Sequence, residues 1–432
     1  MKVVAELAAP APKKPVQSKK AKASTDANVT LYARTKTVET MTAGAAMLDK
    51  LRRAGLAPTT LAWDFTSIAL SAVVADFAER RAMSPDGWTR EFDVQVPVSD
   101  PDLWGAQADK LSQALSFLTT DRWHFTFTTG TAPYIKPKGR RLLKPEADCV
   151  ALLSGGLDSL IGGIDLVQAG QVPYFVSHTV PGDRRNQEEF AARLSAQVLA
   201  LNHNVATGGP TERSQRARSF IFIAYGVLVA TSLEAYADAQ GVDLFVNENG
   251  YISINPPLTR MRVGSLSTRT VHPRFIGLLQ DVLDGGGLEV RLTNPYRFQT
   301  KGEMLKNCKD QALLLELAHQ STSCSRYQRY GYVHCGRCLP CQIRRAAFLR
   351  WGQTDDTDYF YAPLGQNDER HASFDDVRSV ATALSVIQDQ GLDRWLGATL
   401  ASVPTDERDA TRTMLKRGIT ELGALHKSLG VK

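Results

Sequence analysis

Residues 149–159 read CVALLSGGLDS and carry the strongest local signal for the fold. Its first five residues form a continuous apolar run, which is typical of a parallel strand buried on both faces. Gly155 and Gly156 can adopt positive φ and let backbone N–H groups approach a ligand closely. A helical pattern follows over 157–168, so free N–H groups and the positive end of the helix dipole face the loop. The segment therefore predicts a strand–loop–helix unit that binds an anion.

The polar side chains of this loop indicate phosphate as the anion. Ser154 and Ser159 flank the glycines with hydroxyl donors. Asp158 lies among these donors, where a carboxylate can hold Mg²⁺ beside phosphate oxygens. We therefore predict that residues 154–159, Leu157 included, bind a nucleotide. A bare Gly-Gly turn would be read as an ordinary turn with an aspartate helix cap, but the full SGGxDS string favours the functional interpretation.

A cysteine cluster is the second strong signal. Four of the six cysteines lie within residues 324–341, where two overlapping CxxC units and one upstream cysteine supply four thiolates. This is the ligand set of a closed tetrahedral structural zinc site without an open catalytic position. The alternatives are four unrelated buried cysteines or His334 as a ligand, while Cys149 and Cys308 are predicted to be core thiols. The predicted metal ligands are Cys324, Cys335, Cys338 and Cys341.

The pattern around these motifs predicts the fold class. After the loop, apolar strands at 174–177 and 243–247 alternate with helical patterns at 187–201 and 219–240. Such alternation is typical of a doubly wound α/β fold with a parallel sheet. Upstream, 68–78 reads as an amphipathic helix, and 91–98 and 123–128 alternate as strands do.

Composition changes along the chain suggest four parts. We expect a disordered basic tail at 1–28, an accessory N-terminal α+β domain at 29–145 that ends in a linker at 133–145, the nucleotide domain with its zinc-bound region at 146–350, and a helical C-terminal extension at 351–432.

The whole chain of 432 residues is 43% hydrophobic and 22% charged, which is ordinary for a globular protein. Several lysines behind the net charge of +6 lie in the first 22 residues, which fits a solvated arm better than a nucleic-acid surface. The best apolar run, 220–233, is shorter than the ~20 residues that a bilayer requires. No signal peptide is apparent. We expect a cytoplasmic protein with reduced thiols and neither a membrane nor a nucleic acid as partner.

The SGGxDS string resembles the pyrophosphate loop (PP-loop) of the N-type ATP pyrophosphatases, whose domain is adenine nucleotide alpha hydrolase-like. It lacks the spacing of a Walker loop. Such enzymes cleave ATP between the α and β phosphates and transfer AMP to a carbonyl or carboxylate oxygen. The cysteine pattern CGxCxxC, followed by Arg344, narrows the resemblance over residues 145–350 to the 7-cyano-7-deazaguanine synthase family of queuosine biosynthesis. That resemblance implies ATP, Mg²⁺, ammonia and a structural zinc, with 7-carboxy-7-deazaguanine converted to an amide and then a nitrile.

Further residues resemble motifs of this family less closely. Arg218 matches the arginine of its PGRN motif, with serine in place of the asparagine. Asn294-Pro295, followed by Lys301 and Glu303, resembles its Thr-Pro segment and lysine. The resemblance implies catalytic roles for Asp158, Arg218 and Lys301, although the two cations also fit simple surface charge. Glu248, Asn249 and His272 are the residues expected to bind the substrate.

The departures from the family concern the substrate side. Residues 180–184 read VPGDR where the family has Tyr-Gly-Gln-Arg, the loop at 247–257 is rewritten, and residues 267–270 lengthen the chain before His272. Long forms of this kind resemble synthase-like proteins of antiphage defence operons, in which a partner protein accepts the deazaguanine.

We therefore expect an ATP-dependent, adenylating C–N ligase acting on a 7-carboxy-7-deazaguanine-type substrate in a defence system, with an operon protein as acceptor. The first alternative is a free nitrile synthase. The second is a tRNA-modifying thiolase, which would require cysteines that are not committed to zinc. A third, non-enzymatic interpretation as a binding subunit does not explain the intact loop.

Overall fold

The computed structural model describes residues 1–7, 27–33, 40–131, 133, 144–179, 182–238, 241–259, 269–364 and 376–431. These residues form two five-stranded sheets in which every strand pair is parallel. The N-terminal sheet has the order β3 (Met41–Ala43), β2 (Ala27–Leu31), β1 (Lys2–Leu7), β4 (Glu91–Val98), β5 (Arg122–Thr129). The second sheet has the order β10 (Val290–Thr293), β9 (Val242–Phe245), β6 (Cys149–Leu152), β7 (Pro173–His178), β8 (Val198–Leu201).

The second sheet is doubly wound, as the alternating pattern predicted. Strand β6 is central, the next two strands extend to one side, and β9 and β10 extend to the other. Its side chains alternate between two cores, with Val150 and Leu152 in one and Cys149 and Ala151 in the other. In such sheets a ligand binds outside the carboxyl ends of the strands at the point where the winding reverses, which here is the boundary between β6 and β9.

Two predictions about the N-terminal region are wrong. It is wholly parallel and has the same strand order as the second sheet, so this region is α/β and not α+β. Residues 2–7 were expected in a disordered tail, but they form β1, which pairs with both β2 and β4. Val3 and Ala5 are buried there, and this short alternation was obscured by the lysine-rich sequence that follows. Residues 8–26 of that tail, and the linker at 133–145 except 133, 144 and 145, lie outside the described residues.

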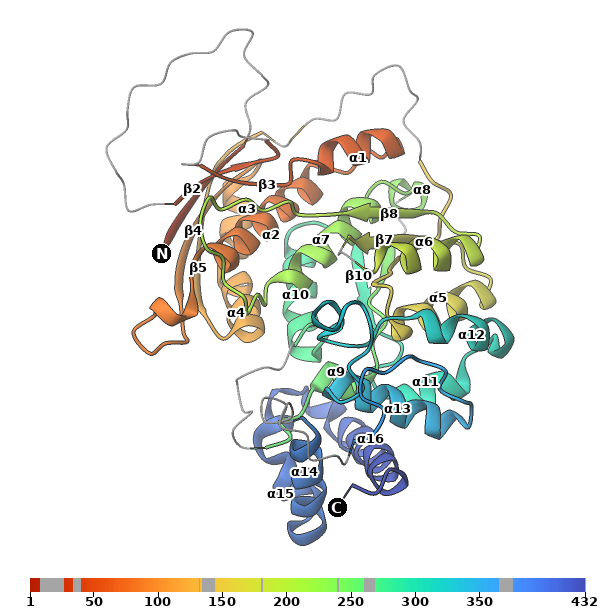
Figure 1. The fold of residues 1–432 in the computed structure, drawn as a ribbon. Coiled ribbons are helices and arrows are strands. Elements are labelled where there is room, and N and C mark those ends of the chain that lie inside the picture. The colour runs from red at the N-terminus through yellow and green to blue at the C-terminus, as the bar shows by residue number, and fades with distance from the viewer. Residues whose placement is uncertain are drawn as a thin grey trace.

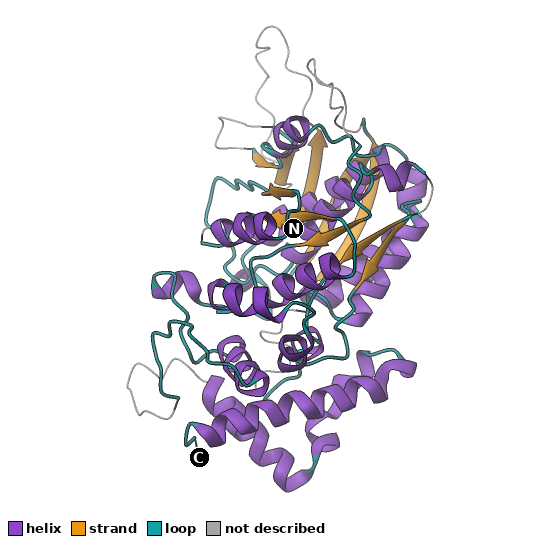
Figure 2. Cartoon of the chain, turned by 90° about the vertical axis from the view of Figure 1, so that its right-hand side faces the viewer, coloured by secondary structure: helices purple, strands orange, loops and turns teal. Residues whose placement is uncertain are grey.

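Helices separate and cover the two sheets (Figures 1 and 2). Helices α2 and α4 pack on the N-terminal sheet, α7 and α10 pack on the second sheet, and the two pairs pack against each other. Both halves therefore share one hydrophobic core. The helices of the first part are α1 (Met47–Ala54), α2 (Thr60–Ala78), α3 (Pro101–Gly105) and α4 (Ala108–Thr119). Those of the second are α5 (Leu157–Gln168), α6 (Arg184–Arg193), α7 (Arg218–Ala230), α8 (Glu234–Ala237), α9 (Gly250–Ile254), α10 (Pro273–Gly285), α11 (Lys301–Asn307), α12 (Gln311–Leu317) and α13 (Leu339–Trp351).

Three helix predictions differ in detail from the structure. The pattern at 187–201 is the end of α6 followed by strand β8, which exists because it pairs with β7. The pattern at 219–240 begins as α7 and breaks after residue 230, and α8 follows. The helix at 68–78 starts earlier, at Thr60. At 19 residues, α2 is long and apolar enough to cross a membrane, contrary to the expectation that 220–233 is the best apolar run, but 83% of its apolar 18-residue stretch is buried inside the protein.

The C-terminal part is helical, as expected, and consists of α14 (Asp376–Gln390), α15 (Leu392–Leu396) and α16 (Arg408–Ser428). Helix α16 packs against α13 and α9, and in Figure 1 the C-terminal helices lie below the second sheet.

Candidate active site

The predicted phosphate loop lies at the carboxyl end of β6, next to the reversal of the winding. Gly155 has φ +84°, a left-handed conformation that glycine adopts without strain. Gly156 precedes α5, whose first N–H groups receive no side-chain cap. The Ser154 and Ser159 hydroxyls lie 3.1 Å apart, and Ser159 also donates to the Gly156 carbonyl at 2.9 Å. The loop therefore presents hydroxyls and free N–H groups to an anion.

A cavity of about 520 Å³ opens above this loop. Its walls contain the loop residues Ser154, Gly156, Leu157, Asp158 and Ser159. Further wall residues come from β7, α7, the segment after β9 and α11, among other elements. Its volume suits a ligand of nucleotide size.

Asp158 and Lys301 form an ion pair inside this cavity, with 2.8 Å between Oδ1 and Nζ. Both side chains are nearly buried, and the other carboxylate oxygen accepts hydrogen bonds from the backbone N–H and the side-chain amide of Asn249 at 3.2 and 2.7 Å. A capping box between Thr300 and Glu303 starts α11 and places Lys301 at its first position. The two predicted catalytic groups are thus brought together.

This arrangement bears on the predicted Mg²⁺ ligand. Both oxygens of Asp158 already face protein nitrogen atoms, and a divalent cation at Oδ1 would lie beside the Lys301 ammonium. Asp158 is therefore the counter-ion of Lys301 in this structure, and its role beside Mg²⁺ stays a prediction.

Glu248 lines the cavity near this pair. Burial raises the pKa of Glu248 to about 7, the charge of Asp158 adds to the rise, and Lys301 and the Thr270 hydroxyl oppose it. Thr270 donates to its carboxylate at 3.2 Å, and Asn294 holds its backbone through a 2.9 Å hydrogen bond to the carbonyl. Glu248 is therefore a fixed carboxyl group that can change charge near neutral pH.

Arg218 also lines the cavity, at the first position of α7, and its side chain is exposed. Two further arginines that the sequence analysis did not select, Arg216 and Arg269, line the same cavity. Three arginine residues thus line the cavity in addition to Lys301, which suits an anionic ligand.

Asn249 and His272 are placed differently from the other predicted residues. Asn249 caps α9 and contacts Asp158, so its side chain is committed to protein partners. His272 caps α10, where Nδ1 accepts from the Arg274 N–H at 3.1 Å and Nε2 lies 3.3 Å from the Ser402 hydroxyl. Neither residue belongs to the cavity wall.

Two cavity residues were missed because nothing in their local sequence distinguishes them. The side-chain amide of Asn247 is buried, and neither its nitrogen nor its oxygen has a hydrogen-bond partner among the described residues. The same holds for Nε2 of His178, at the end of β7. Burial, with the charges of His203 and Arg218, lowers the pKa of His178 to about 3, so its ring is neutral. Buried polar atoms without a protein partner indicate a ligand that supplies one.

The four predicted cysteines come together in a buried cluster. Their sulfur atoms lie within 4.8 Å of one another, and the Cys335–Cys341 and Cys324–Cys338 sulfur pairs are both 3.9 Å apart. Four thiolates at about 2.3 Å from a zinc ion would be about 3.8 Å apart. Backbone N–H groups donate to the sulfurs of Cys324 and Cys335 at 3.2–3.3 Å. The cluster can therefore hold a tetrahedral metal ion.

The cysteine cluster is connected to the phosphate loop. The Thr322 N–H donates to the Gly155 carbonyl at 2.9 Å, two residues before Cys324. Arg344 is fully buried and fixes the same segment through hydrogen bonds to Ser321, Ser323 and the Ala318 carbonyl at 2.7–3.2 Å. The segment before Cys324 thus connects the cysteine cluster to the phosphate loop.

Comparison with known proteins gives a consistent result. No protein-family model matches the chain. It is 29% identical over 246 residues to the 7-cyano-7-deazaguanine synthase of Thiobacillus denitrificans, which covers 50% of this chain and 99% of that protein. It is 37% identical over 237 residues to that of Methanococcus maripaludis, covering 49% and 97%. It is 32% identical over 229 residues to that of Methanococcus aeolicus, covering 49% and 98%.

Proposed function

The chain belongs to the 7-cyano-7-deazaguanine synthase family, and we propose that it uses ATP to activate the carboxylate of a 7-carboxy-7-deazaguanine-type base, releasing pyrophosphate. The observation that carries this proposal is the cavity, in which the anion-binding loop, the Asp158–Lys301 pair and the unpartnered amide of Asn247 meet. This combination suits a ligand with both phosphates and a polar planar ring.

The proposed chemistry starts with attack of a substrate carboxylate oxygen on the α-phosphorus of ATP. The bond from this phosphorus to the bridging oxygen breaks, and pyrophosphate leaves. Ammonia then attacks the acyl carbon and AMP departs, which gives an amide. A second ATP activates the amide oxygen in the same way, and loss of AMP and protons gives the nitrile. Each activation forms one P–O bond and breaks another.

The loop and the cavity cations would stabilise the charge that develops in these steps. Ser154, Ser159 and the first N–H groups of α5 would hold the pyrophosphate. The Lys301 ammonium would neutralise the leaving group or the adenylate, since a fixed charge in a partly dry site needs little reorganisation. Arg218, which also lines the cavity, would serve the same anion.

The base would be recognised by Asn247 and Glu248. A deazaguanine ring presents a carbonyl oxygen next to N–H donors along one edge. The carboxamide of Asn247 offers one donor and one acceptor, and the ionised carboxylate of Glu248 accepts from N–H groups. Because both side chains lie in the cavity wall, a base that lacks this edge would leave buried polar groups without partners.

Two ions belong to the proposal. The cysteine cluster would hold zinc as a structural ion, because its sulfur spacing and its closed set of four thiolates suit that metal. Magnesium would enter with the phosphates of ATP. We place the reaction in the cytoplasm, where the six cysteines would remain reduced, in agreement with their being free in the structure.

Two nucleophiles are candidates for the acceptor of the activated base, ammonia and a protein amine. The curated relatives carry the name of the nitrile-forming synthase, and this supports ammonia as nucleophile and a free nitrile as product. The alternative is a defence-operon protein whose amine replaces ammonia. It draws support from the fact that the relatives match only about half of the chain. A thiolase has less support, because the two cysteines outside the cluster are buried and burial raises the pKa of the Cys149 and Cys308 thiols to about 12.

The experiment that tests the proposal is turnover of Mg²⁺-ATP with 7-carboxy-7-deazaguanine, with and without ammonium, followed by mass spectrometry. Free nitrile in the presence of ammonium is the expected result. Pyrophosphate release with an amide or adenylate but no nitrile would favour a protein acceptor. No base-dependent consumption of ATP would contradict the proposal.

A further inference from the structure

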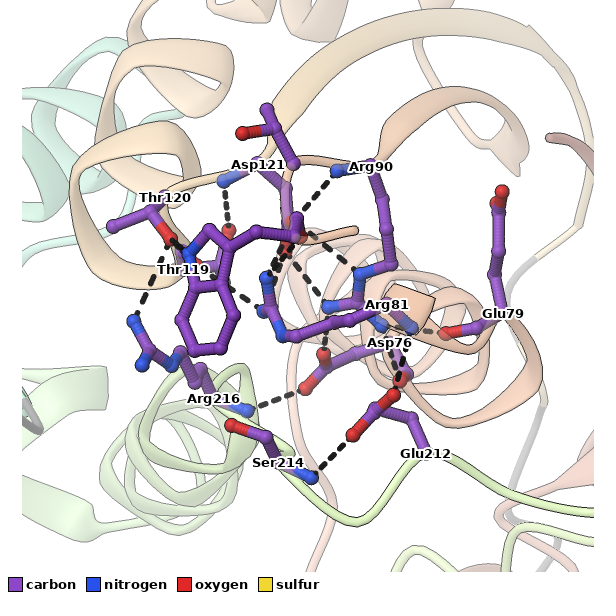
Figure 3. A network of polar contacts seen from close by, with 12 residues as sticks. Asp76, Glu79, Arg81, Arg90, Thr119, Thr120, Asp121, Glu212, Ser214 and Arg216 are labelled. Carbon is purple, nitrogen blue, oxygen red and sulfur yellow. Dashed lines mark hydrogen bonds and ion pairs between the residues drawn. The ribbon is translucent and has the colours of Figure 1, made fainter. Parts of the chain in front are cut away.

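We propose that the N-terminal sheet unit is a working part of the active site, in which Asp76, Trp88 and Phe117 position arginines of the cavity for an anionic ligand. The ligand's identity rests on the proposed function, but the positioning does not. A network of charged residues connects the N-terminal sheet unit to the loop before α7 (Figure 3).

Asp76, near the end of α2, caps the start of α7. Its Oδ2 accepts hydrogen bonds from the backbone N–H groups of Arg216 at 2.6 Å and Ala217 at 2.8 Å. The residue at the N-cap of α7 is Ala217, whose own side chain cannot cap. N–H groups at a helix start require an outside acceptor, and Asp76 supplies it from 140 residues away in sequence. Asp76 thereby holds the two residues that lead into α7, directly before the cavity-lining Arg218.

A buried set of ion pairs holds Asp76 in place. The Arg90 guanidinium lies between Asp76 and Asp121, at 2.5 and 2.7 Å, and all three side chains are fully buried. Arg81 pairs with both oxygens of Asp121 at 2.9 Å. Because desolvation offsets much of the attraction in such a network, we infer that it contributes geometry more than stability.

The loop before α7 is attached at a second place. The Glu212 N–H donates to the Phe77 carbonyl at 2.9 Å, and its Oε2 accepts from the Arg81 N–H at 2.8 Å. Its Oε1 accepts from the Ser214 N–H at 2.6 Å, which closes the loop on itself. The two ends of this segment, Glu212 and residues 216–217, are therefore tied to α2 and to the residues that follow it, and Figure 3 shows the contacts of Glu212 and Arg216.

Arg216 and Arg269 then face the cavity from positions that N-terminal side chains determine. The Arg216 guanidinium lies over the Trp88 ring, 4.9 Å from its centroid. Arg269 donates to the Phe117 carbonyl at 3.0 Å and lies over that ring at 4.5 Å. Leu118, the next residue of α4, forms part of the cavity wall itself. The N-terminal unit therefore both lines the cavity and orients two of its cations.

The ligand group that these arginines would bind is an anion. Burial and the neighbouring Arg81 lower the pKa of Arg216 to about 10, so it remains charged at neutral pH. The proposed reaction supplies two such anions, the phosphates of ATP and the carboxylate of the base. Trp88 and Asp76 act on either one through Arg216 and α7, so they are positioning residues and not catalytic ones.

The test compares Trp88→Leu with Trp88→Phe, which retains an aromatic face for Arg216. Trp88 is half-buried in a loop, so both variants should fold. Isothermal titration with Mg²⁺-ATP and, separately, with 7-carboxy-7-deazaguanine should show binding about two- to fivefold weaker in Trp88→Leu for one of the ligands and near wild type in Trp88→Phe. The weakened ligand identifies the anion. Equal affinities for both ligands in all three proteins would overturn the inference.

A second measurement does not depend on any ligand. Asp76→Asn should speed amide hydrogen exchange at residues 216 and 217, because their N–H groups lose a charged acceptor. The matched control is Asp93→Asn, on β4 of the N-terminal sheet, where the side chain is 69% exposed. Unchanged exchange in Asp76→Asn would overturn the positioning role. A wild-type protein that binds neither ligand would instead contradict the proposed function, and the exchange result would still decide the role of Asp76.

Discussion

Lys301 at the start of α11 and Asp158 at the start of α5 form a nearly buried ion pair inside the cavity, with 2.8 Å between ammonium and carboxylate. The two residues are far apart in sequence, and the fold brings them to the same edge of the second sheet. Their pairing connects the phosphate loop to α11 and fixes the position of one positive charge.

The first prediction concerns this pair. Asp158→Asn should lower kcat by about 100-fold or more, because Lys301 loses the partner that orients it. Breaking a nearly buried pair should also lower the stability by about 3 kcal/mol. The double variant Asp158→Asn, Lys301→Met should regain part of the stability but no activity, as measured by thermal unfolding and pyrophosphate release. Near wild-type turnover in Asp158→Asn would refute the role given to the pair.

The second prediction concerns pH. Because the folded pKa of Glu248 is raised to about 7 from an ordinary value of 4.5, the folded protein holds this proton more tightly than the unfolded chain. The tighter binding of this proton stabilises the folded protein. This stabilisation is fully present below about pH 4.5 and is lost as the pH rises through 7. Binding of the base should strengthen over the same range, since the ionised carboxylate accepts from ring N–H groups.

Profiles of kcat/KM and of the unfolding midpoint against pH would measure both effects. Glu248→Gln is the matched variant, because it keeps the shape and removes the titration. A change near pH 7 in either profile that persists in Glu248→Gln would show that another group is responsible.

The third prediction separates backbone strain from function. Gly155 and Gly170 both have positive φ, +84° and +80°, but only Gly155 belongs to the phosphate loop. Alanine at either position should destabilise the fold by about 1–2 kcal/mol. Only Gly155→Ala should also weaken ATP binding, measured by titration at a temperature where both variants are folded. Equal ATP affinity in the two variants would argue against phosphate binding at this loop.

The fourth prediction concerns the cysteine cluster. Cys338→Ser, or removal of metal by a chelator, should lower the unfolding temperature and reduce ATP affinity together, because Thr322 connects this region to the Gly155 carbonyl. Cys308→Ser is the control, since Cys308 is equally buried but lies outside the cluster. Elemental analysis should find about one zinc per chain in the wild type and in this control. Retained metal in Cys338→Ser would contradict the assignment of the ligand.

Local sequence predicted the parts of the site that are themselves local. The SGGLDS string contains both the turn and the helix start that create an anion site, and the CxxC spacing brings its thiolates together within one turn. Lys301 was found only through a resemblance, since a lysine next to a capping box is unremarkable by itself.

The parts that sequence did not reveal depend on distant contacts. Strand β8 has no distinctive pattern and exists because it pairs with β7. The alternation of β1 is short and is followed by a lysine-rich stretch. Asn247 was passed over in favour of its neighbours because only the fold determines which of three adjacent polar side chains faces the cavity. The role of Asp76 depends on a partner 140 residues away.

Transfer of an oxygen isotope from the base to AMP would test whether the carboxylate is activated as an adenylate. The protein would be incubated with Mg²⁺-ATP, ammonium and 7-carboxy-7-deazaguanine whose carboxylate carries ¹⁸O, and the nucleotide and phosphate products would be analysed by mass spectrometry. Activation as an adenylate predicts that AMP acquires a carboxylate oxygen while pyrophosphate stays unlabelled. Label in inorganic phosphate with ADP as the nucleotide product, or turnover that leaves AMP unlabelled, would contradict it.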